Sequence, residues 1–230
     1  MNVAIIVAAG SGSRMGGGGR AKQFREISGI PIIIHTLSRF EQCETIGRVV
    51  AVVPAGEEEG LLALARAHGL GKLARAVAGG RSRTESVWRG LQASAEARES
   101  GGVVAVHDGV RPFVRPEEID GVVREAERSG AAILAAPASD TIKESSEDGL
   151  RVARTLARSR LWQAQTPQCF RFELLERAYR LALAEGLEAT DDSALVERTG
   201  APVAIVPGGA HNLKITTPHD FALAEILLRG

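Results

Sequence analysis

The sequence has few cysteines, no excess of charge and no long apolar run, and each absence excludes a class of protein. Cys43 and Cys169 are the only cysteines in 230 residues, too few and too far apart for a disulfide framework or a Cys-x-x-Cys metal site. The 28 basic and 28 acidic residues cancel, which argues against generic nucleic-acid binding. No apolar run reaches the roughly 18 residues of a membrane span. We therefore expect a cytoplasmic protein that binds neither nucleic acid nor membrane.

The order of short and long segments predicts the fold. Short β-branched runs alternate with segments of helical period, a pattern typical of a parallel sheet covered by helices. Strands are expected at Val3–Ala8, Arg48–Val53, Ala74–Ala78, Val103–His107, Ala131–Ala136 and Val203–Val206. Helices are expected at Ile32–Glu41, Glu57–His68, Thr84–Glu99, Pro116–Ser129, Glu173–Glu185, Asp191–Glu197 and Thr217–Leu228. The sequence predicts one α/β domain over residues 1–230, doubly wound, with a mostly parallel, Rossmann-like sheet.

The alternation breaks between Pro137 and Thr166. Asp148-Gly149 is a typical turn, and the segments Asp140–Glu144 and Leu150–Arg154 on either side of it have strand character. We expect a β-hairpin arm inserted at about residues 138–160. Because a lone hairpin is at best marginally stable, it should pack on something, and a twofold partner is the obvious candidate.

A glycine-rich segment, residues 8–23, follows the first expected strand. Glycines let backbone N–H groups approach phosphate oxygens, and Arg14, Arg20 and Lys22 add positive charge that suits a triphosphate. A purely structural glycine turn is the alternative. The Rossmann dinucleotide fingerprint does not fit, because Met15 occupies the third-glycine position and no acid ends the second expected strand. A P-loop does not fit either, because no Gly-Lys-Ser/Thr follows.

A second polar cluster, His107-Asp108-Gly109-Val110-Arg111-Pro112, ends the fourth expected strand, at the sheet edge where open sheets bind ligands. Asp108 is there a candidate magnesium ligand, although an Asp-Gly pair is about as often a simple turn. We expect His107 to be partly buried with its hydrogen bonds satisfied, rather than a metal ligand. Further polar clusters lie at expected loops, where each is also typical of a helix cap or turn: residues 79–86, 164–168, 189–193 and 212–216.

Taken together and in order, these clusters resemble the 2-C-methyl-D-erythritol 4-phosphate cytidylyltransferase family over nearly the whole chain. The segments that carry the resemblance are AAGSGSRM with Lys22-Gln23, GGRSRTESV, VHDGVRP, DTIK, LWQAQTPQ, TDDSAL and NLKIT. Two departures concern local base contacts: four consecutive glycines at Gly16–Gly19, and Ser82 where the family often has an acid. The resemblance implies transfer of a cytidylyl group from CTP to a sugar-alcohol phosphate in isoprenoid precursor synthesis, with release of pyrophosphate.

The resemblance also implies roles for individual residues. The residues expected to stabilise the charged transition state are Arg14, Lys22 and Lys214. The expected nucleotide contacts are Ala8, Ala9, Gly10, Gly12, Gly80, Arg83 and Ser86. The expected sugar-phosphate contacts are Arg111, Thr141, Arg158, Thr166 and Thr190. Asp108 is expected to hold Mg²⁺, the one cofactor, and the chain is expected to be a homodimer in which arm residues complete the neighbouring pocket.

Two alternatives of different kinds remain at the level of sequence. A cytidylyltransferase acting on ribitol 5-phosphate would use a similar small phosphorylated polyol. A non-catalytic nucleotide-binding module would keep the glycine loop but would not need Arg14, Lys22, Asp108 and Lys214 together. No nucleophilic serine, cysteine or histidine arrangement is apparent, which favours direct in-line displacement.

Overall fold

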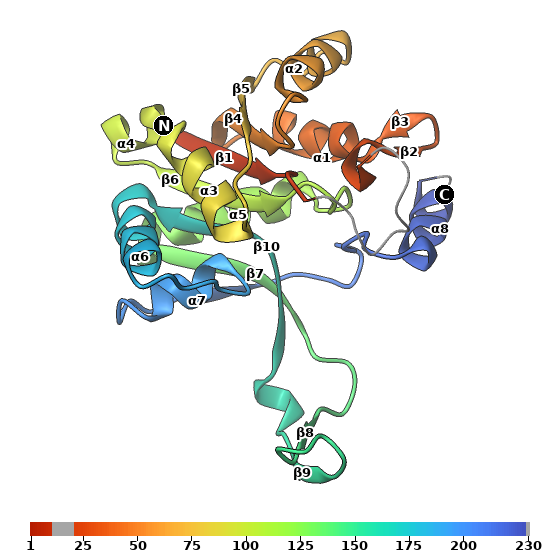
Figure 1. The fold of residues 1–230 in the computed structure, drawn as a ribbon, viewed down its shortest axis with the longest axis vertical. Helices are drawn as coiled ribbons and strands as arrows, with labels where there is room; N and C mark the ends of the chain where they lie inside the picture. The colour runs from red at the N-terminus through yellow and green to blue at the C-terminus, as the bar shows by residue number, and fades with distance from the viewer. Residues whose placement is uncertain (11–20, 229–230) are drawn as a thin grey trace.

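The computed structural model describes residues 1–10 and 21–228, and its centre is a seven-stranded sheet (Figure 1). The strands lie in the order β11-β7-β10-β6-β1-β4-β5, and all pairs are parallel except those of β10 with β6 and β7. Their bounds are β1 Asn2–Val7, β4 Ile46–Val53, β5 Leu73–Ala78, β6 Val103–Asp108, β7 Ala131–Pro137, β10 Trp162–Arg171 and β11 Ala204–Pro207. The predicted doubly wound, mostly parallel α/β fold is confirmed.

Two apolar cores lie on opposite faces of this sheet, because successive side chains of a strand point to opposite faces. In β1, Ala4 and Ile6 join one core while Val3 and Ile5 join the other. The first core is covered by α1 Ile32–Glu41, α2 Glu58–Ala67 and α5 Pro116–Ser129. The second is covered by α3 Arg83–Gln92, α4 Ala95–Ser100, α6 Phe172–Ala184 and α7 Asp192–Glu197. The inner strands β1, β6 and β7 are therefore buried on both faces, as their continuous apolar runs predicted, whereas the edge strands β5 and β11 are only partly covered.

Strand β10 is the main difference from the expected fold. Residues 164–168 were expected to form a loop, but they lie within β10, so that expectation was wrong. Pro167 cannot donate a ladder hydrogen bond, and the pairing of β10 with β7 shifts register between Ala164 and Gln168. Three polar residues of β10 are buried, namely Gln165, Thr166 and Gln168. Their side chains form hydrogen bonds instead of packing in an apolar core, so the sequence shows no apolar strand pattern there.

The expected helix Thr84–Glu99 is divided into α3 and α4, so a single helix was also wrong there. α3 ends at Gln92, and the side chain of Ser94 donates a hydrogen bond to the carbonyl of Gly90 at 2.8 Å. A serine bonded back to the preceding turn competes with the helical backbone pattern.

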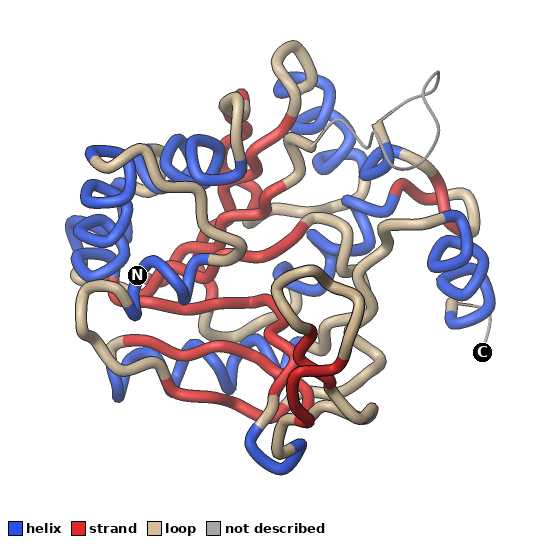
Figure 2. Tube along the Cα trace, turned by 60° about the horizontal axis from the view of Figure 1, so that its bottom comes forward, coloured by secondary structure: helices blue, strands red, loops and turns tan. Residues whose placement is uncertain are grey.

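The inserted arm is present and projects from the body, downward in Figure 1 and toward the viewer in Figure 2. Its strands, β8 Lys143–Ser145 and β9 Val152–Thr155, pair antiparallel. The Asp148 side chain accepts hydrogen bonds from Ser146 and from the Leu150 backbone N–H, and Gly149 adopts a φ of 72°. The Asp-Gly signal thus marks the turn correctly.

Short elements and the C-terminal helix complete the described chain. These are η2 Lys22–Phe24, β2 Glu26–Ile27, β3 Ile30–Pro31, η3 Arg158–Arg160 and α8 Pro218–Leu227. α8 joins a third, small core through Ala224, which packs with Ile27 and Ile215. Within residues 1–10 and 21–228, no helix combines the length and apolar character that crossing a membrane requires.

Candidate active site

A cleft of about 500 Å³ opens at the carboxyl ends of β1, β5 and β6. The chain continues from β1 to β4 on one side and returns to β6 on the other, so the cleft lies at the switch point where open sheets bind ligands. Its lining comes from five separate segments: Val7 to Gly10, Lys22 and Gln23, Gly80 to Arg83 with Ser86, Asp108 with Val110, and Lys214.

Close packing of the main chain shapes one wall. The Ala8 N–H donates to the Val52 carbonyl at 2.7 Å, and the buried Gln23 side chain donates to the Ala8 carbonyl. A Cβ atom at Gly79 would lie 2.1 Å from the Cβ of Ala9, so only glycine fits there. The Gly80 N–H donates to the Ser86 hydroxyl at 3.0 Å. The segment after β1 and the segment after β5 therefore pack together and form one wall of the cleft.

Asp108 ends β6 beside Val7 of β1 and is the acidic residue among those that line the cleft. Its carboxylate is 2.9 Å from Lys214 Nζ and 3.4 Å from Arg111 Nε. Burial raises the pKa of this carboxyl, but Lys214, then Arg83 and Arg111, outweigh it and hold the pKa well below its usual range. The turn after β6 uses the main-chain carbonyl of Asp108, which accepts from the Arg111 N–H at 3.1 Å. The ionised Asp108 side chain therefore contacts cations, and the turn is formed by the main chain.

The donor set around Asp108 limits which metal fits. Over the described ranges, no three His, Cys, Asp or Glu side chains gather into a metal cluster. A zinc site would need four protein ligands if structural or three if catalytic, so zinc does not fit. Mg²⁺ commonly takes one or two carboxylates together with substrate phosphates, so a single ionised aspartate in a phosphate-sized cleft fits it.

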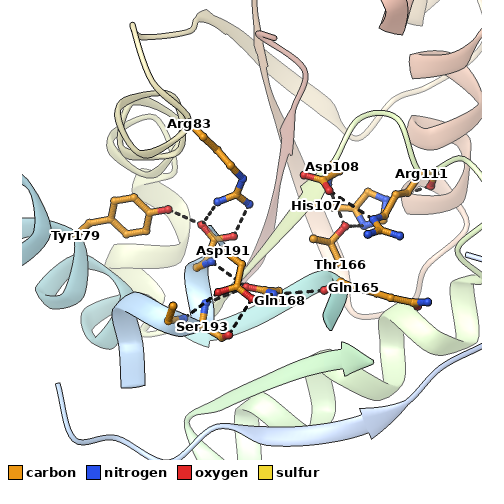
Figure 3. A network of polar contacts seen from close by, with 12 residues as sticks. Arg83, His107, Asp108, Arg111, Gln165, Thr166, Gln168, Tyr179, Asp191 and Ser193 are labelled. Carbon is orange, nitrogen blue, oxygen red and sulfur yellow. Dashed lines mark hydrogen bonds and ion pairs between the residues drawn. The ribbon is translucent and has the colours of Figure 1, made fainter. Parts of the chain in front are cut away.

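A buried hydrogen-bond chain fixes the backbone of Asp108 (Figure 3). The Asp108 N–H donates to Thr166 Oγ1 at 3.1 Å, and Thr166 Oγ1 lies 3.1 Å from His107 Nδ1. His107 Nε2 lies 3.2 Å from the Arg111 carbonyl, which only accepts, so Nε2 carries the proton and Nδ1 accepts from Thr166. Burial lowers the pKa of His107 to about 4, which keeps the ring neutral. The expectation that His107 has its hydrogen bonds satisfied is confirmed, and the residue is fully rather than partly buried.

The structure brings most of the predicted site residues together and leaves others apart. Those that line the cleft are Ala8, Ala9, Gly10, Lys22, Gly80, Arg83, Ser86, Asp108 and Lys214. Arg111 and Thr166 contact Asp108. Thr190 is exposed just before α7, and Thr141 and Arg158 are exposed on the arm, where Arg158 Nη1 donates to the Ser139 carbonyl at 2.9 Å. Gly12 and Arg14 lie outside the described residues.

Comparison with known proteins then decides the family. The sequence profile of the 2-C-methyl-D-erythritol 4-phosphate cytidylyltransferase family matches residues 2–230. The chain belongs to this family. The cytidylyltransferase of Syntrophus aciditrophicus is 44% identical over 228 residues, covering 99% of this chain and 95% of that protein. That of Symbiobacterium thermophilum is 46% identical over 224 residues, covering 97% and 91%.

Solved structures of the family agree. The 4-diphosphocytidyl-2C-methyl-D-erythritol synthase of Anaerococcus prevotii has a TM-score of 0.87 at 29% identity, covering 100% of this chain and 96% of that one. The cytidylyltransferase of Thermus thermophilus has a TM-score of 0.78 at 34% identity, covering 98% of both chains. The prediction from the sequence of a cytidylyltransferase acting on 2-C-methyl-D-erythritol 4-phosphate is confirmed by this membership.

The sequence pattern did not indicate the residues behind the cleft. Arg83 is paired with Asp192, which in turn contacts Tyr179 and Gln168, and none of these three had been assigned a role. One signal was present: TDDSAL has two consecutive acids, and a helix N-cap needs only one. Asp191 is that cap, accepting from the Ala194 N–H at 3.0 Å, which leaves Asp192 for another purpose.

Proposed function

We propose that this chain joins CTP to 2-C-methyl-D-erythritol 4-phosphate by direct in-line displacement. A phosphate oxygen of the sugar alcohol attacks the α-phosphorus of CTP, the bond to the β-phosphate breaks, and pyrophosphate leaves. The observation that carries the proposal is the convergence of Lys22, Arg83, Asp108 and Lys214 on one cleft walled by the Ala8–Gly10 backbone. Membership in the family supports the choice of substrates.

The work of the cleft in this proposal is electrostatic. Both reactants are anions, so their repulsion is the main barrier to approach. Lys22 and Lys214 supply positive charge fixed in position before the reaction, which costs no reorganisation as charge builds up on the α-phosphate. Lys214 is held by Asp108, with Nζ 2.9 Å from its carboxylate, so its position is set before substrate arrives. Arg14 is proposed to act with them.

Magnesium dependence is part of the same proposal, with Asp108 as the protein ligand. Bound Mg²⁺ would neutralise triphosphate oxygens and polarise the α-phosphate. Lys214 and Arg111 keep Asp108 ionised and therefore competent as a ligand. Arg111 also donates to the Asn212 carbonyl at 2.7 Å, which ties the Asp108 turn to the segment that carries Lys214.

We also propose a homodimer in which the arm reaches a neighbouring subunit. Every residue of β8 and β9 is exposed, and Leu150 at the turn and Val152 present apolar side chains to solvent. Thr141 and Arg158 lie on this arm rather than in the cleft of their own chain. With Arg111, Thr166 and Thr190, they are proposed to hold the sugar phosphate.

A cytoplasmic location is proposed as well. It rests on the sequence expectation given above, and cell fractionation with an antibody against the chain tests it. Recovery of the chain in a membrane or extracellular fraction would contradict it.

The test of the reaction is pyrophosphate release from CTP with each of two acceptors, 2-C-methyl-D-erythritol 4-phosphate and ribitol 5-phosphate, with Mg²⁺ or with chelator. We expect turnover with the first acceptor and Mg²⁺ only. Preferred use of ribitol 5-phosphate would establish the alternative cytidylyltransferase, and CTP binding without turnover would establish a binding module. Asp108→Asn should abolish the Mg²⁺ dependence of CTP affinity measured by calorimetry.

A further inference from the structure

The Arg83 side chain, which lines the cleft, is held from behind by a buried carboxylate. Arg83 Nη1 donates to Asp192 Oδ1 at 3.0 Å, and Nη2 donates to Asp192 Oδ2 at 2.7 Å. The Asp192 side chain is 0% exposed and that of Arg83 is 27% exposed. This two-pronged geometry fixes the plane of the guanidinium as well as its position.

Besides Arg83, two residues hold Asp192 in place, Tyr179 and Gln168. The Tyr179 hydroxyl on α6 donates to its Oδ1, and the Asp192 backbone N–H donates to Gln168 Oε1 on β10 at 3.0 Å. Gln168 also accepts from the Ser193 N–H and donates to Asp191 Oδ2 at 3.0 Å. Arg83 comes from α3 and Tyr179 from α6, and Figure 3 shows both side chains pointing toward one carboxylate. The carboxylate therefore has no freedom to follow a moving arginine.

Charge keeps the contact intact. Burial by itself lowers the pKa of the Arg83 guanidinium, but Asp192 more than offsets this and the pKa is raised. Burial, followed by the Asp192 charge, raises the pKa of Tyr179 well above its usual range, so its hydroxyl keeps the proton that it donates. The Arg83 guanidinium therefore keeps its charge and the Tyr179 hydroxyl keeps its proton, so both remain donors to Asp192.

The contact leaves part of Arg83 available. A guanidinium has five N–H donors, and the two bonds to Asp192 use two of them. The other three are not taken up by Asp192, and Arg83 lines the cleft with its side chain 27% exposed. We propose that Asp192 is a positioning residue for CTP: it orients the Arg83 guanidinium so that its remaining N–H groups face the nucleotide. The inference rests on the proposed function, in which the cleft binds CTP.

A variant of Asp192 distinguishes an effect of Arg83 orientation on CTP binding from an effect of charge alone, because the two predict opposite changes in CTP affinity. Asp192→Asn removes a negative charge near the site of an anionic ligand, so charge alone would tighten CTP binding. Loss of orientation weakens it, because Arg83 no longer has a two-pronged anchor. We expect about a tenfold rise in the Kd and KM for CTP, the size of one charged hydrogen bond, with the KM for the sugar phosphate unchanged.

The experiment measures CTP binding by calorimetry with Mg²⁺, and steady-state pyrophosphate release, for wild type, Asp192→Asn, Arg83→Ala and the double variant. The double variant should bind CTP as weakly as Arg83→Ala alone, because Asp192 acts through Arg83. Asp120→Asn is the matched control: Asp120 is also a buried carboxylate, 6% exposed, but it binds the Glu44 and Thr45 backbone away from the cleft. It should bind CTP normally.

Unchanged or tighter CTP binding by a folded Asp192→Asn protein overturns the inference, as does a full additional loss in the double variant. If Asp192→Asn does not fold, Tyr179→Phe replaces it, with a few-fold rise in Kd expected in the wild-type background and none in the Arg83→Ala background. An equal effect in both backgrounds contradicts positioning. Normal CTP binding without pyrophosphate release in the wild type would sink the proposed function while leaving this test in force.

Discussion

At the scale of single residues, lysine is rare, and two of the four lysines line the cleft. The chain has lysine only at Lys22, Lys72, Lys143 and Lys214. Lys22 and Lys214 line the cleft. Lys72 instead donates to the carbonyls of Phe40 and Cys43 at the end of α1, where a cation stabilises orphan helix carbonyls.

Replacement of the two cleft lysines should affect rate far more than folding. Lys22→Ala and Lys214→Ala each delete a charge aimed at the transition state, and a loss of about 2.7–4 kcal/mol corresponds to about a hundred- to a thousandfold in kcat. Lys72→Ala is the control, expected to lower the thermal midpoint with kcat within a few-fold of wild type. Cleft variants with near-normal rates would remove the lysines from the mechanism.

Asp120 predicts a specific pH dependence of stability. Its carboxylate accepts from the Thr45 N–H at 2.9 Å, the Thr45 hydroxyl at 2.6 Å and the Glu44 N–H at 3.2 Å. Burial raises the pKa of Asp120, but these hydrogen bonds outweigh it and the pKa is lowered. A carboxyl with a lowered folded-state pKa stabilises fully above the unfolded value of about 3.9 and loses that contribution as pH falls.

Asp120→Asn should therefore lower the free energy of unfolding by about 1–3 kcal/mol at pH 7, because its amide N–H₂ opposes a backbone donor. The difference from wild type should stay constant down to about pH 5 and narrow below about pH 4. Urea unfolding at a series of pH values measures it. A gap that widens as pH falls would show that the carboxylate does not have the lowered pKa.

At the scale of elements, the space around a helix glycine shows how closely that helix packs on the sheet. A Cβ at Gly90 of α3 would lie 2.6 Å from Ile5 Cγ2 and 2.9 Å from Val52 Cγ2, whereas a Cβ at Gly121 of α5 would meet nothing within 4 Å. Gly121→Ala should stabilise the protein by about 0.5–1 kcal/mol through helix propensity. Gly90→Ala should destabilise it, because overpacking costs about 1–3 kcal/mol.

Thermal unfolding of the two glycine variants tests this contact. About 1 kcal/mol corresponds to a shift of about 2–4 °C in Tm for a chain of this size, so opposite shifts should be resolved. If both variants are stabilised alike, α3 does not touch β1 and β4 as closely as described. The comparison is matched because both substitutions are Gly→Ala inside a helix.

Elements with a strong local period were predictable from the sequence, and those held by distant polar contacts were not. α1 and α5 have the expected bounds because their apolar faces repeat at the helical period. β10 was missed because its central residues are buried through side-chain hydrogen bonds, as when Gln165 accepts from the Asn212 amide at 3.0 Å. No local pattern encodes such partners.

The candidate site divides in the same way. The wall of the cleft was predictable because it consists of loops at strand ends, and the strand order brings those ends together. The support of Arg83 was not, because Asp192 lies 109 positions further along the chain. Family resemblance supplied residue roles that periodicity alone leaves open, including those of Thr141 and Arg158 on the arm.

At the scale of the whole molecule, the residues proposed to bind the two substrates lie in two separate places, the cleft and the arm. The cleft lies at the carboxyl ends of strands of the central sheet, whereas the exposed strands of the arm project from the body (Figure 1). Arg158 does not line the cleft of its own chain, so we propose that it binds the sugar phosphate in a different subunit from the one whose Lys22 binds the nucleotide. A twofold dimer satisfies this geometry with two equivalent shared sites.

Mixing inactive variants tests the shared site. In a mixed dimer of Lys22→Ala and Arg158→Ala subunits, one site combines an intact cleft with an intact arm and the other has neither. Random exchange makes about half of the dimers mixed, so about a quarter of wild-type activity should return. Lys22→Ala mixed with Lys214→Ala is the control, because both changes lie in the cleft and no mixed dimer regains a complete one. Return of activity in the control, or its absence in the test mixture once exchange is verified by mass spectrometry, would place Arg158 and the cleft in a single chain.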